Sequence, residues 1–194
     1  MTETPTFYRE RPIFGFDIGF NSVKLMQIEN IGKKSVVTGY GVTNFDQKAV
    51  KNGVIVDPEI IAKEVYELIT KNVIGEITTR RVTAAIPVSR SFNRVLSLPK
   101  MDKSDLRDAI NSEAEQYIPI PIDDLYLDFE VADIAMKEEK SKEEKKDAVE
   151  EIEALVVATP RKIVDSYITL FDILGLELSA VSYTHLTLPT ICSV

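Results

Sequence analysis

The stretch that most constrains the fold of this chain is residues 13–29, IFGFDIGFNSVKLMQIE. Its two arms, 13–18 and 23–29, are rich in apolar and β-branched residues and flank a short turn of Gly, Phe, Asn and Ser. Such arms around Gly and Asn predict a hairpin of two antiparallel strands. Asp17 ends the first arm just before the turn, so we expect a carboxylate at the mouth of a buried strand.

The residues around this turn suit a Mg²⁺–phosphate group. Gly19 gives the backbone freedom to turn, and the amide groups of the turn, which includes Asn21 and Ser22, can face an anion. Lys24 returns a positive charge beside Asp17, whose carboxylate would hold the metal or its waters while the turn holds phosphate oxygens. An Asp-x-Gly turn between strands is also common as a turn and nothing more, so the residues alone leave both interpretations open.

Composition excludes several classes of function. The net charge of −8 disfavours nucleic acid or anionic lipid as the main partner, because either favours a basic face. No apolar run is long enough to span a membrane, and residues 1–12 lack the apolar core of a secretory signal, so we expect a cytoplasmic protein. His185 and Cys192 are the only residues of their types, which excludes thiol nucleophiles, histidine triads and Cys/His zinc sites from residues 1–184.

The segments around the hairpin predict an α/β lobe. Residues 1–11 are expected to be a flexible leader, and residues 35–42 a third strand. Asp57 and Pro58 predict a capped helix start, followed by apolar residues at helical spacing. Residues 82–86 then predict a buried strand.

A different unit is expected over residues 89–151. It would hold a strand that ends at Pro99, a helix that Asp102 caps and whose end Pro119 marks, and a strand from Leu125 to Met136. Its charged run 137–147, KEEKSKEEKKD, has no apolar stripe and predicts a solvated loop.

Residues 152–181 are predicted to return to the first lobe. They hold a buried strand over 152–158, a helix capped by Thr159-Pro160, Gly175 in the left-handed position past that helix, and a last strand over 176–181.

Several of these segments resemble the PilM family of type IV pilus assembly, a branch of the actin and hexokinase ATPase superfamily related to the division protein FtsA. The hairpin resembles the first phosphate loop of that superfamily. Four further motifs carry the likeness over about residues 12–181: Ala85-Ile-Pro87, Leu96-Ser-Leu-Pro99, EAEQYIPIP from Glu113 to Pro121, and VVATPRK from Val156 to Lys162. The segment Gln116–Pro121 favours PilM over FtsA.

The resemblance implies an actin-like (ribonuclease H-like) lobe from residues 12–88 and 152–181, with an inserted FtsA/PilM-type α+β subdomain for protein contacts at 89–151. It implies binding of ATP and Mg²⁺ at Asp17, Gly19, Asn21, Ser22 and Lys24, with Asp17 reaching the metal through water. It also implies a partner, the cytoplasmic tail of a PilN-like inner-membrane protein, and a position at the membrane held through that partner.

The resemblance fails after Val181. Residues 182–194 do not match the family, and we expect a foreign tail on the front half of a longer protein whose second lobe is missing. Because the enclosing contacts of a nucleotide cleft would lie in that lobe, weak or no ATP binding is expected for this chain alone. An exposed apolar patch and self-association are expected for the same reason.

Four functions therefore stay open. The leading one is a nucleotide-binding scaffold of the PilM type, with at most slow ATP hydrolysis, because no general base accompanies Asp17. The others are an FtsA-like division scaffold, an interaction module that binds no nucleotide, and a small-molecule kinase, which would need a catalytic Asp and a second lobe.

Overall fold

A computed structural model describes residues 11–132 and 151–184 of the chain. The described residues form two compact units. The first contains residues up to Ile86 together with Ser166–Ser182, and the second contains Pro87–Asp165. Residues 1–10 of the predicted leader, the charged run 137–147 and most of the predicted tail lie outside the described residues.

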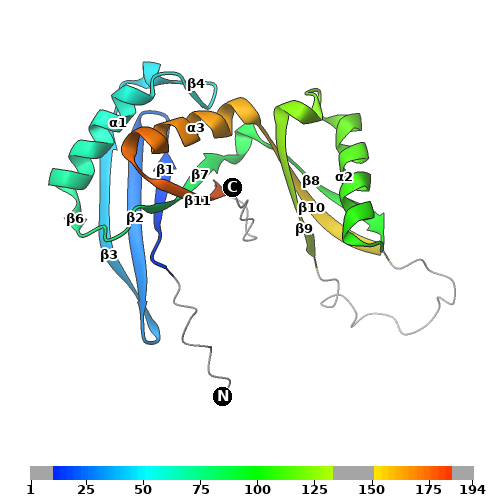
Figure 1. The fold of residues 1–194 in the computed structure, drawn as a ribbon, viewed down its shortest axis with the longest axis horizontal. Helices are drawn as coiled ribbons and strands as arrows, with labels where there is room; N and C mark the ends of the chain where they lie inside the picture. The colour runs from blue at the N-terminus through cyan, green and yellow to red at the C-terminus, as the bar shows by residue number, and fades with distance from the viewer. Residues whose placement is uncertain (1–10, 133–150, 185–194) are drawn as a thin grey trace. The chain divides into compact units, whose positions relative to one another are not determined.

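The first unit is built on a six-stranded sheet in the order β11-β7-β1-β2-β3-β6 (Figure 1). The strands are β1 (Phe14–Ile18), β2 (Ser22–Ile31), β3 (Lys34–Asn44), β6 (Ile74–Gly75), β7 (Arg81–Pro87) and β11 (Glu177–Thr184). The segment after β3 holds a short 3₁₀ turn, η1 (Gln47–Ala49), and a small ladder of β4 (Val50–Lys51) and β5 (Val54–Ile55). The predicted opening hairpin is confirmed, since β1 pairs antiparallel with β2 and parallel with β7.

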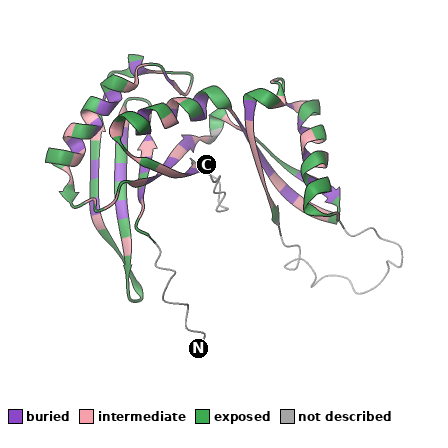
Figure 2. Cartoon of the chain, viewed as in Figure 1, coloured by how far each residue is buried: buried purple, intermediate pink, exposed green. Residues whose placement is uncertain are grey.

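Two helices cover one face of this sheet. They are α1 (Pro58–Glu67), which continues into one π-helical turn, η2 (Leu68–Asn72), and α3 (Arg161–Leu174), whose residues from Ser166 onward belong to the first unit. The rings of Phe16 and Phe171 meet edge to face at 5.1 Å, which places α3 on the face that carries Phe16. Leu68 lies over Gly41 on the same face, where a Cβ at Gly41 would come within 2.8 Å of it. Alternate residues of β1, β2 and β7 are buried on this side (Figure 2).

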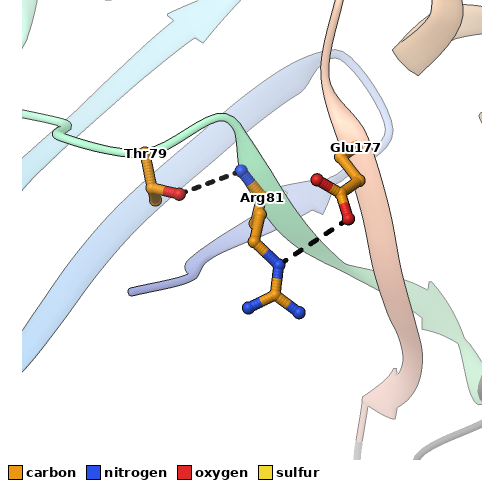
Figure 3. A network of polar contacts seen from close by, with 3 residues as sticks. All are labelled: Thr79, Arg81 and Glu177. Atoms are coloured by element: carbon orange, nitrogen blue, oxygen red, sulfur yellow. Dashed lines mark hydrogen bonds and ion pairs between the residues drawn. The ribbon is translucent and has the colours of Figure 1, made fainter. Parts of the chain in front are cut away.

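The other face of the sheet carries no helix among the described residues. Large apolar side chains are exposed on it along β2 and β3: Met26, Ile28, Val37, Tyr40 and Val42. At its β11 edge the Arg81 Nε atom lies 3.8 Å from the Glu177 carboxylate, and Thr79 accepts a hydrogen bond from the Arg81 N–H at 3.1 Å (Figure 3). We call this face of the sheet, which no described helix covers, the open face.

A register shift divides β2 in two. Residues 23–27 pair with both β1 and β3, but the pairing with β3 shifts between Gln27 and Ile28. Beyond the shift, residues 28–31 pair with β3 alone within the described part of the chain. This distal ribbon of β2 and β3 carries exposed Ile31 and Val36 near its turn.

The second unit is a three-stranded antiparallel sheet with one helix. The sheet order is β8 (Phe92–Pro99), β10 (Glu151–Pro160), β9 (Leu125–Ala132), and the helix is α2 (Lys103–Tyr117). The Asp102 side chain accepts hydrogen bonds from the N–H groups of Ser104 and Asp105, which confirms the predicted cap. Leu106 and Ile110 of α2 are buried against apolar residues of β8 and β10.

The sequence analysis assigned the strand over 152–158 to the first lobe, and this assignment is wrong. It is β10, and it pairs with β8 on one side and β9 on the other, as the central strand of the second unit. The boundary between units accordingly follows Asp165 instead of residue 151. The apolar run did predict a buried strand, but such a run does not indicate which sheet contains the strand.

Three local predictions at helix and strand ends have different outcomes. Asp57 precedes α1 but makes no side-chain capping bond. Gly175 has a φ of +64° after α3, and the Leu176 N–H reaches back to the Phe171 carbonyl at 2.9 Å, so the left-handed cap is confirmed. The strand predicted to end at Val181 continues to Thr184, so no break in structure occurs at residue 182.

Candidate functional site

The candidate site is the turn between β1 and β2 with the first residues on either side of it. The turn is closed by the Gly19 N–H, which donates to the Ser22 carbonyl at 2.7 Å. The Phe45 N–H donates to the Asn21 carbonyl at 2.9 Å and ties the turn to the end of β3. The five predicted residues therefore lie together on one held turn and its flanking strands.

Asp17 and Lys24 face each other across the hairpin. They are directly opposite in the β1–β2 register, and the Lys24 Nζ atom lies 3.8 Å from the Asp17 carboxylate. The side chains are 39% and 60% exposed for Asp17 and Lys24 respectively, so the pair is hydrated and contributes little to stability. Both groups remain open to a ligand at the sheet surface.

Gly19 does not have a left-handed backbone, which corrects the sequence argument, and it lies in a confined part of the turn. Within the described residues, positive φ values occur at other glycines and at Asn52, but not at Gly19. A Cβ at Gly19 would lie 3.2 Å from Ser22 Oγ, a distance tighter than most real contacts. The Gly19 N–H already bonds to the Ser22 carbonyl and so is not available to an anion, and the tip of the turn lies at the solvent, where Phe20 is 76% exposed.

The donor set fits a water-mediated divalent ion better than a direct one. Among the described residues, no group of three or more His, Cys, Asp and Glu side chains could hold a metal ion. Asp17 is then a single carboxylate near the turn, and one carboxylate with waters and phosphate oxygens is the usual way in which proteins hold Mg²⁺. The residues present therefore fit Mg²⁺ only together with a phosphate ligand.

A cavity of about 450 Å³ lies beside the pair on the open face. Five strands of the sheet contribute to its lining, which includes Gly15 and Asp17 of β1, Lys24 and Met26 of β2, Tyr40 and Val42 of β3, Thr83 and Ala85 of β7, and Ser182 of β11. Ala85 is opposite Asp17 in the parallel β1–β7 register. Sequence reasoning missed Thr83 and Ala85 as neighbours of Asp17, because nothing in the sequence specifies that β7 pairs with β1. It missed Tyr40 because the register of β3 against β2 has no local signal.

Asp17 also acts on the buried side of the unit. Burial raises the pKa of the Tyr167 phenol above its usual value, and the negative charge of Asp17 raises it further. The phenol therefore stays neutral at physiological pH, and its ring packs against Phe171. Tyr167 is therefore a core residue whose pKa is affected by the charge of Asp17 in the candidate site.

Comparison with known protein families shows which family this chain belongs to. Residues 15–187 match the family described as type IV pilus assembly protein PilM. The chain belongs to the PilM family. Its first unit is accordingly the α/β lobe of an actin-like fold, and the match extends beyond Val181, where the sequence analysis placed the end of the likeness.

Solved structures agree on the fold of this PilM-family chain. A structure described as a PilM–PilN type IV pilus biogenesis complex superposes with a TM-score of 0.73 at 22% identity, covering 88% of this chain and 47% of that one. The cytoplasmic domain of EpsL, an inner-membrane component of the type II secretion system of Vibrio cholerae, superposes with a TM-score of 0.53 at 11% identity, covering 89% and 57%. The chain thus spans about half the length of these relatives.

The part of the chain that the structure describes contains no helix with the length and apolar content needed to cross a bilayer.

Proposed function

We propose that this PilM-family chain is part of a scaffold for type IV pilus assembly that binds ATP and Mg²⁺ within a longer protein. The single observation that supports this most is the family match over residues 15–187, which includes the Asp17–Lys24 pair at a closed turn. A phosphate at the turn would meet the Lys24 ammonium group and the tip amides, while Asp17 would orient a water of the bound ion. Gly19 and Ser22 would keep the turn in shape.

The proposal gives this chain only half of a nucleotide site. Asp17 and Lys24 lie on an open sheet surface, where a bound ligand would stay hydrated. Few contacts would then compensate for the entropy that the ligand loses when it is immobilised. We expect calorimetry to detect weak or no ATP binding by residues 1–194, and any hydrolysis by the longer protein to be slow. A sub-micromolar dissociation constant for residues 1–194 would refute the half-site argument.

Nucleotide binding is tested on the longer protein. Lys24→Ala should weaken ATP binding about tenfold or more, since it removes a charged contact to phosphate. Lys51→Ala, which removes an exposed lysine from β4 of the same unit, is the matched control and should bind ATP normally. Equal ATP affinities for the two variants would exclude Lys24 as a phosphate contact, whereas no ATP binding by the unmodified longer protein would favour an interaction module without nucleotide, a function for which the engaged Gly19 amide argues.

We propose further that the partner is the cytoplasmic tail of a PilN-like inner-membrane protein, which would hold this protein at the cytoplasmic side of that membrane. Support comes from the solved complex of a PilM relative with PilN. A pull-down of residues 1–194 with a PilN-like tail, with and without Mg-ATP, tests this. Loss of binding when the tail sequence is scrambled is expected, and retention would contradict the proposal.

A further inference from the structure

A second cavity lies at the other end of β1 from the turn of Gly19, where β1 begins and where η2 and α3 end. Its volume is about 310 Å³. The apolar side chains in its lining include Phe14, Ile69, Ile77, Leu174 and Leu176. Phe14 is buried, but the four aliphatic side chains are only half-buried, so they keep apolar surface that nothing among the described residues covers. We call this cavity the base cavity.

The N-terminal segment of the chain joins the first unit at this cavity. Phe14 lines the base cavity and follows closely on the segment 1–10, MTETPTFYRE, which lies outside the described residues. The aromatic residues of that segment are Phe7 and Tyr8, seven and six positions before Phe14. At about 3.3 Å per residue, a chain of that length that turns back once, as Pro12 favours, reaches the lining.

The size and the polar groups of the base cavity suit these two aromatic residues. An apolar cavity of about 150 Å³ holds one benzene ring, so a cavity of about 310 Å³ has room for two rings. A buried tyrosine needs a partner for its hydroxyl group, and Thr70 and Arg80 in the lining supply one. Thr70 Oγ1 donates to the Tyr66 carbonyl at 2.6 Å and can still accept from a phenol. The segment also carries Glu10, which is opposite in charge to the exposed Arg80.

We infer that Phe7 and Tyr8 dock in the base cavity of their own chain, so that the N-terminal segment straps the end of the first unit. The segment is favoured over a separate partner because a short connection joins it to Phe14 of the lining, which gives it an effective concentration of about millimolar. The matched family region begins at residue 15, so the family relationship does not supply this contact. The inference does not depend on nucleotide binding, since the turn of Gly19 lies at the other end of β1.

Nuclear Overhauser effects measured on the whole chain test the contact directly. We expect the ring protons of Phe7 and Tyr8 to show effects to methyl groups of the lining, and Phe7→Ala and Tyr8→Ala assign these signals. The methyl groups are those of Ile69, Ile77 and Leu174, and an absence of effects to all three would overturn the inference. A mixture of isotope-labelled and unlabelled copies identifies the occupant. Effects that arise only between copies would mean that the segment docks in a second copy, and would also overturn the inference.

Thermal unfolding of the first unit gives a second test. Phe7→Ala should lower the melting temperature by about 3 °C or more, because it removes the docked ring. Phe20→Ala is the matched control, since it makes the same change at a ring that is 76% exposed, and it should stay within about 1 °C of the wild type. Ile77→Ala removes part of the lining, so Phe7→Ala should lower the melting temperature by less in that background. Equal effects of Phe7→Ala and Phe20→Ala, or an undiminished effect of Phe7→Ala in the Ile77→Ala background, would overturn the inference.

Discussion

Gln27 is the buried polar residue on which the first unit depends most clearly. Its side chain is fully buried in β2. The amide nitrogen donates to Thr78 Oγ1 at 2.6 Å and to the Glu29 carboxylate at 2.7 Å, and the amide oxygen accepts from the Thr78 N–H at 2.9 Å. These three bonds hold the segment before β7 against the sheet, so we expect Gln27→Leu to destabilise the first unit.

The magnitude follows from the bonds that are lost. Two are between neutral groups, at about 0.5–1.5 kcal/mol each, and one goes to a carboxylate, at about 1.5–3 kcal/mol. Because Thr78 and Glu29 keep access to water, the lower end applies, and the apolar surface of leucine recovers about 1 kcal/mol. The net loss is therefore about 1.5 kcal/mol, or about 0.75 M in the urea midpoint at a slope of about 2 kcal/mol per M.

Urea unfolding followed by far-ultraviolet circular dichroism measures this loss. Gln47→Leu is the control, because it makes the same chemical change at an exposed position of the same unit. A Gln27→Leu midpoint within about 0.2 M of the wild type would refute the reasoning, since it would mean that the three bonds contribute no net stability.

Three further predictions concern single side chains. Tyr167 has a pKa raised by burial and then by Asp17, so its contribution to stability is present below about pH 10 and is lost as the pH rises through the folded-state value; Tyr167→Phe should therefore flatten the alkaline decline of the melting temperature. Gly39→Ala places a Cβ in steric conflict with the Glu76 backbone carbonyl, and should lower the melting temperature by about 5 °C or more in calorimetry; an unchanged value would contradict the close approach. Asp102→Ala should cost about 1 kcal/mol in urea unfolding and Asp102→Ser much less, so equal losses would argue against the helix cap.

The sequence predicts best where one residue pattern has one local solution. The hairpin of β1 and β2 follows from its alternation and its turn, and α2 from the cap at Asp102 and the spacing of its apolar residues. Gly175 likewise follows from a local requirement of the backbone. None of these needs knowledge of a distant segment.

It predicts poorly where the outcome depends on pairing between distant segments. Which sheet receives β10, and which strand lies next to Asp17, are settled by long-range pairing that leaves no local pattern. Arg161 is a smaller case: at the start of α3 its charge opposes the helix dipole, and nothing local in the sequence indicates a partner for it. The side chain is exposed, but its guanidinium stacks over Tyr126 at 4.3 Å and its Nε donates to the Asp123 carbonyl at 2.6 Å. The nucleotide role of the turn stays a prediction.

The register shift in β2 has a consequence for how the first unit moves. Residues 23–27 have a strand on either side, so their amide protons should exchange with solvent only when the whole sheet opens. Residues 28–31 are supported by β3 alone, and a two-stranded ribbon is marginally stable in water. One continuous strand therefore contains two classes of exchange behaviour, and the distal ribbon should open and close many times while the sheet that carries Asp17 and Lys24 stays intact.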